Sequence, residues 1–358
     1  MTVLTLSAEA VSSLLLSRYG LRTRHVELLD AEEATVCRVS VPGRVLAVRV
    51  MGGDVAVNQW HGEVLAALGG SGLPVPVLVR DLSGSVTSMA GPDVQMQVTS
   101  WLPGLPLASL PAVSLRDLLL DVGRMAARLS AALAAVPAPH YPVTHIWELS
   151  QSASSIRTAL ASVSDRRTVA LAGAALARFA AEVEPFAGDL PRAVVHHDLH
   201  DSNLLTSVDS AGRRYLSGIL DFGDTVYGLR VAELAVAAAY AARPFPDPVD
   251  AFLAEVSGWS SAGAALTDAE CAVLYPAAVA RLAVNAAVWA SRFGGPRDDY
   301  ARARASGSLD ALERMLAIPT AEVTATIGGI AGRARGPAPG RVGGRDPEQA
   351  VPSRRIRG

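Results

Sequence analysis

The chain contains 358 residues, of which half are hydrophobic and 18% are charged. This composition excludes an intrinsically disordered protein, which combines low hydrophobicity with high net charge. The 32 basic side chains nearly balance the 34 acidic ones, so no global basic charge indicates a nucleic-acid partner. All 32 basic residues are arginine, and the lack of lysine excludes any reaction that needs a lysine nucleophile or Schiff base.

The length predicts two domains or lobes. The cysteines, Cys37 and Cys271, are far apart in the chain, which favours free buried thiols and a reducing, cytoplasmic location. The first ten residues have neither the basic region nor the apolar block of a signal peptide. The apolar residues 273–290 are interrupted by Pro276 and Arg281, so we expect a buried core helix and no membrane partner.

Much of the first hundred residues consists of short runs whose sequence pattern is typical of β-strands. Residues 7–19 have leucines at helical spacing, with Ser7 as the expected N-cap and Gly20 as the expected end. Strands are then expected at 25–29, 35–41, 44–50, 75–80, 85–89 and 94–100, with one helix at 58–68 after the third strand. This part of the chain therefore predicts a strand-rich lobe.

The character changes after the Leu-Pro-Gly-Leu-Pro run at residues 102–106. Helical apolar spacing marks residues 115–135, 147–162, 168–183, 231–241, 268–290 and 300–317, around one β-rich island at 193–222. The last residues are mainly Gly, Pro and Arg. We therefore expect an α+β, two-lobed fold: a strand-rich N-lobe of residues 1–100, a larger helical C-lobe of residues 101–330, and a disordered tail of residues 331–358.

The densest polar stretch lies in the β-rich island. Asp198 and Asn203 share one loop, and Asp221 follows a later strand. Phosphoryl transfer needs a carboxylate to orient the attacking hydroxyl and to accept its proton, together with hard oxygen ligands for Mg²⁺. Asp198 suits the first task, and Asn203 and Asp221 suit the second.

The spacing His196-x-Asp198-x-x-x-x-Asn203, followed by Ile-Leu-Asp-Phe-Gly at 219–223, resembles the aminoglycoside phosphotransferase family. This family also holds choline, homoserine and hydroxylysine kinases, and it has a protein-kinase-like fold. Residues 218–235 are most similar to its hydroxylysine-kinase-like branch. The resemblance implies a Mg²⁺-dependent kinase that uses ATP or GTP to phosphorylate a hydroxyl on a small molecule such as an amino alcohol, hydroxy amino acid or aminoglycoside.

The same resemblance implies roles for single residues. Asp198 would be the catalytic base, and Asn203 and Asp221 would hold magnesium. His196 would be a structural residue of the catalytic loop, and Glu233 would help to fix that loop.

In the N-lobe, a kinase-like fold places a cation on the third strand, held by a helix carboxylate. Arg49 is the expected cation and Glu63 its expected partner, although arginine does not replace lysine without cost. The adenine would lie at the hinge, against Ser100, Trp101 and Leu102. The expected phosphate-covering loop, residues 30–35, lacks glycine and carries three carboxylates, which is unusual for a phosphate site.

The acceptor pocket is harder to predict. Asp224 would face the substrate or brace the loop. Asp201 would reach a cationic substrate or only water. Trp147, Tyr240 and Trp289 would line the pocket or pack in the core.

Two alternatives stay open at this point. A metal-dependent hydrolase would use the cluster His196, His197, Asp198 and His200, although the remaining histidines have no ligand-like spacing and His197 and His200 also suit ordinary loop positions. A non-catalytic kinase-like binding protein would explain the acidic loop and the missing lysine, but not three intact motif residues.

Overall fold

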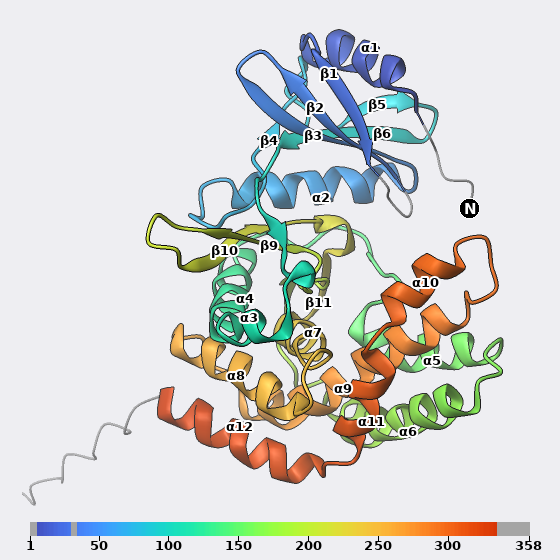
Figure 1. Ribbon diagram of the computed structural model, residues 1–358, viewed down its shortest axis with the longest axis vertical. Helices are drawn as coiled ribbons and strands as arrows, with labels where there is room; N and C mark the ends of the chain where they lie inside the picture. The colour runs from blue at the N-terminus through green and yellow to red at the C-terminus, as the bar shows by residue number, and fades with distance from the viewer. Residues whose placement is uncertain (1–5, 30–33, 335–358) are drawn as a thin grey trace, which may run out of the picture.

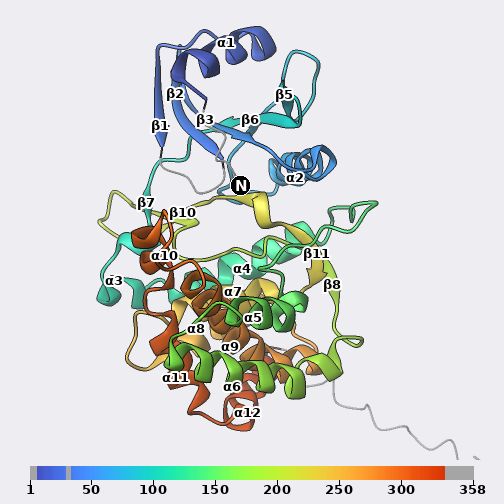
Figure 2. The same ribbon diagram turned by 90° about the vertical axis from the view of Figure 1, so that its right-hand side faces the viewer.

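The computed structural model describes residues 6–29 and 34–334, so most of the acidic loop and of the Gly/Pro/Arg tail lies outside the described residues. Figure 1 shows a smaller lobe with the sheet above a larger lobe built mainly of helices. The expected two-lobed α+β arrangement is confirmed. Figure 2, a view from the side, shows the irregular loops of the β-rich island between the two lobes.

The N-lobe is a six-stranded antiparallel sheet among the described residues, in the order β1-β2-β3-β6-β4 with β5 paired to β6. Its elements are α1 (Ala8–Tyr19), β1 (His25–Leu29), β2 (Thr35–Val41), β3 (Arg44–Met51), β4 (Leu78–Val79), β5 (Ser88–Gly91) and β6 (Val94–Ser100). In β2 and β3 alternate side chains are buried, as expected for strands with one face on a core. Val11 and Leu15 of α1 pack on that face with Val48 and Met96.

Helix α2 (Val55–Leu68) joins the two lobes. Asp54 caps its N-terminus by accepting hydrogen bonds from Ala56 N and Val57 N. Its apolar residues belong to the core of the large lobe, and His61 Nε2 lies 2.9 Å from Thr225 O in that lobe. The small lobe therefore rests on the large one through this helix.

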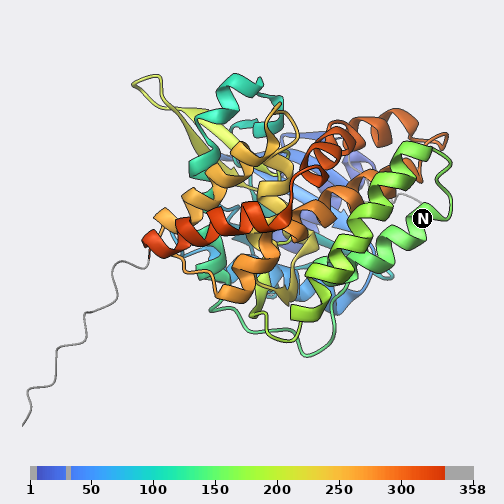
Figure 3. The ribbon, with the colours of Figure 1, turned by 90° about the horizontal axis from the view of Figure 1, so that it is seen from below.

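The C-lobe surrounds helix α9 (Asp268–Ala290), which a Thr267–Glu270 capping box begins. The other helices are α3 (Ala112–Arg116), α4 (Leu119–Leu133), α5 (Ser152–Leu160), α6 (Arg166–Glu182), α7 (Ala232–Ala241), α8 (Pro248–Ser261), α10 (Asp298–Ala305), α11 (Ser308–Leu316) and α12 (Thr320–Ala334). Helix α9 has the length and hydropathy of a membrane span, but 94% of its most apolar window is buried. It is the core helix that the sequence predicts, and Figure 3 shows α12 crossing beneath the lobe.

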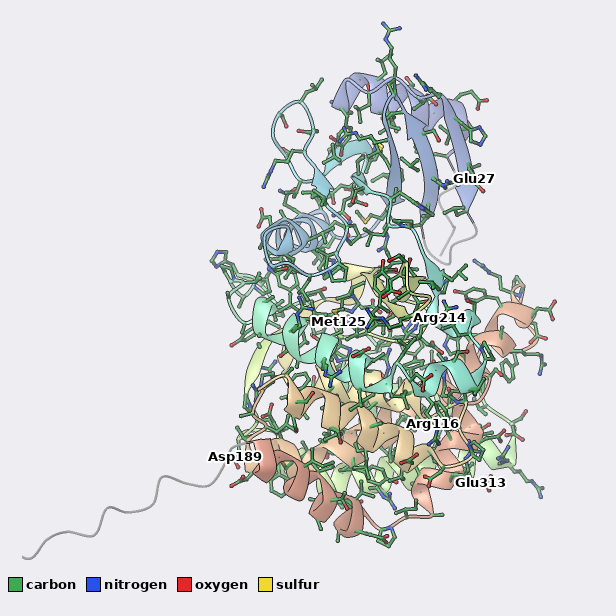
Figure 4. All side chains as sticks on the ribbon, turned by 60° about the vertical axis from the view of Figure 1, so that its left-hand side comes forward. Glu27, Arg116, Met125, Asp189, Arg214 and Glu313 are labelled. Atoms are coloured by element: carbon green, nitrogen blue, oxygen red, sulfur yellow. The ribbon has the colours of Figure 1, made fainter. Side chains whose placement is uncertain are left out.

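Helices α4 and α8 cross in very close contact. A Cβ atom on Gly123 would lie 1.9 Å from Glu255 O, and one on Gly258 would lie 2.1 Å from Leu120 O. Only glycine allows the two backbones to approach so closely. Met125, labelled in Figure 4, is another buried residue of α4, two positions after Gly123.

Three short pairs of β-strands flank the polar loops of the β-rich island. Strand β8 (Arg192–Val195) pairs with β11 (Val226–Leu229), and β9 (Leu204–Val208) pairs with β10 (Arg214–Ile219) and with β7 (Leu105–Pro106). The β9–β10 hairpin projects from the body of the lobe (Figure 3). Residues 196–203 connect β8 to β9, and Asp221 follows β10, so both motif segments meet on the same side of these strands.

Several predicted boundaries differ from the structure. The strand expected at 75–80 shortens to Leu78–Val79, and the helix expected at 300–317 divides at Gly307, whose φ of 75° interrupts it. The helices expected at 115–135 and 147–162 also begin with separate short turns. Helix α8 was not expected, although Asp247 caps it and Pro248 is its first residue, which together are a helix-start signal.

Candidate active site

Asp198 lies in the loop between β8 and β9, with its side chain 14% exposed. Its Oδ1 accepts a hydrogen bond from Arg281 Nη2 at 2.9 Å, and its Oδ2 accepts one from Asn203 Nδ2 at 2.8 Å. Burial opposes ionisation, but the His200 and Arg281 charges lower the pKa of Asp198 well below its usual range. The site therefore holds an ionised carboxylate in a fixed orientation.

Asn203 is turned so that its amide oxygen stays available. Its Nδ2 donates to Asp198 O at 3.0 Å as well as to Asp198 Oδ2. Only the NH₂ end of an amide donates, so these two acceptors fix its orientation. The backbone carbonyl of Asn203 accepts a hydrogen bond from Leu220 N at 2.8 Å, which ties the loop to the residue before Asp221.

Asp221 begins the turn after β10 in a left-handed conformation, with φ 55°. Its side chain is 46% exposed, and its Oδ1 accepts from Gly223 N and from Arg49 Nη1, the latter at 2.5 Å. The surrounding protein partly desolvates the carboxylate and so opposes ionisation, but the Arg49 guanidinium lowers the pKa of Asp221. The structure thus brings together Asp198, Asn203 and Asp221, as the motif spacing predicts.

His196 and Glu233 brace the loop from behind. His196 Nε2 lies 2.9 Å from Leu220 O, and its ring packs edge-on against Phe222 at 4.7 Å. Glu233 is fully buried at the start of α7, where its Oε2 accepts from His196 N at 2.8 Å. Burial raises the pKa of Glu233 to about 8. These contacts fit the structural roles that the resemblance implies.

His200 and Asp201 continue the network away from Asp198. His200 Nε2 lies 3.3 Å from Asp198 Oδ2 and Nδ1 lies 3.4 Å from Asp201 Oδ1, while the ring stacks on Tyr240 at 4.8 Å. Both Asp201 oxygens accept from Arg243 Nη2, at 2.7 and 3.0 Å. Asp201 therefore has protein partners on both oxygens, rather than the open carboxylate that a role with a cationic substrate or water requires.

The histidines do not form the cluster that a hydrolase needs. His197, with φ 67°, accepts from Leu149 N at 2.9 Å, while His196 and His200 bond to other partners. Across residues 6–29 and 34–334, no group of three or more His, Cys, Asp or Glu side chains is placed to hold a metal ion. A magnesium–nucleotide site differs, because two protein oxygens and the phosphates suffice there.

Asp224 closes the turn after Asp221. Its backbone carbonyl lies 2.9 Å from His145 Nε2, and its carboxylate accepts no hydrogen bond from the described residues. Burial and the charges of Asp198 and Asp221 raise its pKa to about 7. Among Asp198, Asp221 and Asp224, Asp224 is therefore the carboxylate whose pKa is raised rather than lowered.

The expected Arg49–Glu63 ion pair is not formed. Arg49 reaches down from β3 to Asp221, and Glu63 lies on the exposed side of α2, where its Oε1 accepts from Gln59 Nε2 at 3.4 Å. The side of α2 that faces the large lobe presents His61 instead. Glu63 lies in a helix, as its spacing predicts, but its side chain is on the exposed side of that helix.

The hinge follows β6 as expected. Ser100 N donates to Val77 O at 2.8 Å and Trp101 N donates to Val45 O at 3.1 Å. Trp101 and Leu102 are half-buried, and the Arg38 guanidinium lies 5.4 Å from the Trp101 ring. An adenine at this hinge would meet neither of those two N–H groups, since both are already bonded.

Aromatic rings gather beside Asp198. Trp147 is half-buried and lies 5.8 Å from Trp289, while Trp289 and Tyr240 are buried. The Arg281 guanidinium lies between the rings of Trp147 and Tyr240. The sequence motifs do not include Arg281, so they did not predict it as a site residue. The signal in the sequence that could have indicated it is an arginine in the middle of a largely apolar helix.

Comparisons with known proteins identify the family to which the fold and the motif point. A family model described as "Phosphotransferase enzyme family" matches residues 31–266. Hydroxylysine kinase from Danio rerio is 27% identical over 58% of this chain and 61% of its own, and that from Mus musculus is 28% identical over 53% and 54%. The chain thus aligns with little more than half the length of these curated relatives.

Solved structures show the same fold. A microcompartment-associated aminopropanol kinase has a TM-score of 0.66 at 20% identity, covering 86% of this chain and 98% of its own. An amicoumacin kinase in complex with AMP-PNP, Ca²⁺ and Ami has a TM-score of 0.64 at 14% identity, covering 89% of this chain and 97% of its own. The protein-kinase-like fold that the sequence predicts is therefore confirmed.

Proposed function

Because the chain belongs to the phosphotransferase enzyme family, we propose that it transfers the γ-phosphate of ATP or GTP to a hydroxyl group of a small molecule. The observation that carries this proposal is the meeting of Asp198, Asn203 and Asp221 in one site, where hydrogen-bond donors hold both carboxylates and Asp198 fixes the orientation of the Asn203 amide. This is the constellation that phosphoryl transfer requires.

Asp198 supplies the base. Its carboxylate would accept a hydrogen bond from the acceptor hydroxyl and aim that oxygen at the γ-phosphorus. As the new O–P bond forms and the bond to the leaving nucleoside diphosphate breaks, the hydroxyl proton passes to Asp198. A carboxylate this well hydrogen-bonded is a weak base, so orientation is the larger part of its contribution.

The donor set fits a magnesium ion. Asn203 Oδ1 accepts no hydrogen bond from the described residues, and the Asp221 carboxylate is 46% exposed and already attracts the Arg49 cation. We assign Asn203 and Asp221 as the metal ligands and Arg49 as a phosphate-binding cation. When bound, magnesium supplies charge neutralisation for the nucleotide phosphates.

We propose an amine-bearing alcohol as the acceptor. The aligned relatives are named for hydroxylysine, and a structural neighbour is named for aminopropanol. Asp224 supports the choice, because a carboxylate without a hydrogen-bond donor would ionise beside an ammonium group.

The test is an ADP-release assay with ATP, Mg²⁺ and a panel of hydroxylysine, aminopropanol and aminoglycosides. We expect acceptor-dependent release with one amine-bearing alcohol. Asp198→Asn should lower kcat by roughly 10²–10⁴-fold, the usual contribution of a general base. The matched control is Asp209→Asn at the hairpin turn, where Asp209 accepts from the backbone of Arg213, and it should leave kcat unchanged. Full turnover by Asp198→Asn would contradict the assignment of the base.

A further inference from the structure

Arg281 is a charged residue in the long, largely buried helix α9. Its side chain is 3% exposed, and its neighbours Ala280 and Leu282 are fully buried. Burying a guanidinium in an apolar helix costs free energy unless it is paired and hydrogen-bonded. The catalytic motif does not include this position, so the charge needs its own explanation.

The contacts of Arg281 all lead to the catalytic carboxylate or to its surroundings. Nη2 donates to Asp198 Oδ1 at 2.9 Å, and Nη1 donates to Trp147 O at 2.9 Å. The guanidinium lies 5.3 Å from the Trp147 ring and 5.5 Å from the Tyr240 ring. Two aromatic faces thus confine its plane while two hydrogen bonds fix its direction.

The residues that hold the guanidinium are themselves held. Tyr240 donates its hydroxyl proton to Asn285 Oδ1 at 3.0 Å, one turn along α9 from Arg281. Asn285 Nδ2 donates to Ser308 Oγ at 2.7 Å, at the start of α11. Trp147 packs against Trp289 at 5.8 Å. Residues of two helices, α7 and α9, and the turn that contains Trp147 therefore set the position of the guanidinium.

A count of hydrogen bonds shows what this pairing achieves. An ionised carboxylate offers about four lone-pair sites. Arg281 donates to Asp198 Oδ1 and Asn203 donates to Oδ2, while His200 Nε2 lies 3.3 Å from Oδ2. Oδ1 therefore keeps a lone pair to which no described residue donates, and the hydrogen bonds on the two oxygens fix its direction.

We propose that Arg281 is a positioning residue for phosphoryl transfer: it fixes the rotation of the Asp198 carboxylate so that the remaining lone pair faces the acceptor hydroxyl. The inference rests on the proposed function, because it assumes that Asp198 is the base. Arg281 acts through Asp198 and does not itself contact the nucleotide.

The test compares Arg281→Lys with wild type, using ATP, Mg²⁺ and the best acceptor of the panel. Lysine keeps the charge but has no planar fork to reach both Asp198 and Trp147 O. We expect kcat to fall by roughly 10²-fold, the cost of misplacing a catalytic group by about an ångström, with the KM for ATP unchanged. Added guanidinium should raise the kcat of Arg281→Ala, and methylammonium at the same concentration should not.

The matched control is Arg230→Lys. Arg230 donates from Nε to Glu270 Oε1 at 2.9 Å, so it also pairs with a buried carboxylate on α9, but far from Asp198 in the hydrogen-bond network. This variant should lose stability and keep its kcat. Equal losses of kcat in Arg230→Lys and Arg281→Lys would overturn the proposal, as would a wild-type kcat in Arg281→Lys.

A crystal structure of Arg281→Lys supplies a readout that needs no turnover. We expect the Asp198 carboxylate to rotate while the backbone of residues 196–203 stays in place. An Asp198 carboxylate unmoved in that variant would overturn the proposal. Lack of any turnover by wild type would instead count against the proposed function, so the two failures are distinguishable.

Discussion

In the proposed metal site, Asn203 would contribute a neutral amide and Asp221 a carboxylate. Asp198 fixes the amide by accepting from its Nδ2, so the orientation of one proposed ligand depends on the proposed base. Arg49 forms an ion pair with the other proposed ligand at 2.5 Å. Removal of either side chain should therefore affect nucleotide binding before it affects the fold.

We expect Asn203→Ala to weaken Mg²⁺-dependent ATP binding by roughly tenfold or more, or about 1.4 kcal/mol for each factor of ten. Calorimetry with ATP and Mg²⁺, repeated with EDTA, measures this. Asn58→Ala is the matched control, since Asn58 only donates to Gly52 O at the start of α2. An unchanged Mg²⁺-dependent affinity for ATP in Asn203→Ala would contradict the assignment of Asn203 as a metal ligand.

Glu233 makes stability depend on pH. Its pKa is raised from 4.5 to about 8 by burial, so between these values the folded protein keeps a proton that the unfolded chain has released. Stability should then fall as pH rises through this window, by up to about 1.4 kcal/mol per pH unit. Glu233→Gln should remove this contribution, which urea unfolding at pH 5, 6, 7 and 8 would detect. Parallel pH curves for the two proteins would be inconsistent with a protonated Glu233.

The residues that the sequence could predict are those joined by short spacing. Asp198, Asn203 and Asp221 lie on consecutive loops, so a motif locates them. Arg281 is 83 residues from Asp198, and only the packing of α9 brings them together. Glu63 shows the opposite failure, because its spacing suited a partner for Arg49 while the rotation of α2 placed it on the surface.

At the scale of elements, the crossing of α4 and α8 controls the packing beneath the catalytic loop. Glycines face each other there, and backbone carbonyls occupy the space of any side chain. Helix α8 was not expected, although buried Phe252, Val256 and Trp259 recur at helical spacing; its close approach to α4 depends on Gly258, which no apolar pattern marks.

We expect Gly123→Ala to destabilise the protein by about 1–3 kcal/mol, since the new Cβ would clash with Glu255 O and push the helices apart. Chemical denaturation measures the change. Gly173→Ala in α6 is the matched control: nothing lies within 4 Å of its Cβ position, so alanine should be neutral or stabilising by up to about 1 kcal/mol. Equal effects of the two substitutions would show that the crossing tolerates a methyl group.

At the scale of the whole molecule, the site lies where the lobes meet. Arg49 comes from the N-lobe sheet, Asp221 from the β-rich island and Arg281 from the core helix of the C-lobe. Composition and periodicity predict the two lobes, because strand alternation and helical spacing are local properties. The contacts between the lobes, such as that of His61 with Thr225, come from tertiary packing, and no local sequence pattern predicts them.

The most direct test of the central claim is ³¹P NMR of a reaction containing the protein, ATP, Mg²⁺ and hydroxylysine or aminopropanol. We predict a new phosphomonoester resonance that grows in step with ADP and is lost in Asp198→Asn. Formation of ADP with inorganic phosphate alone, or of the same phosphomonoester at full rate by Asp198→Asn, would contradict a phosphotransferase that uses Asp198 as its base.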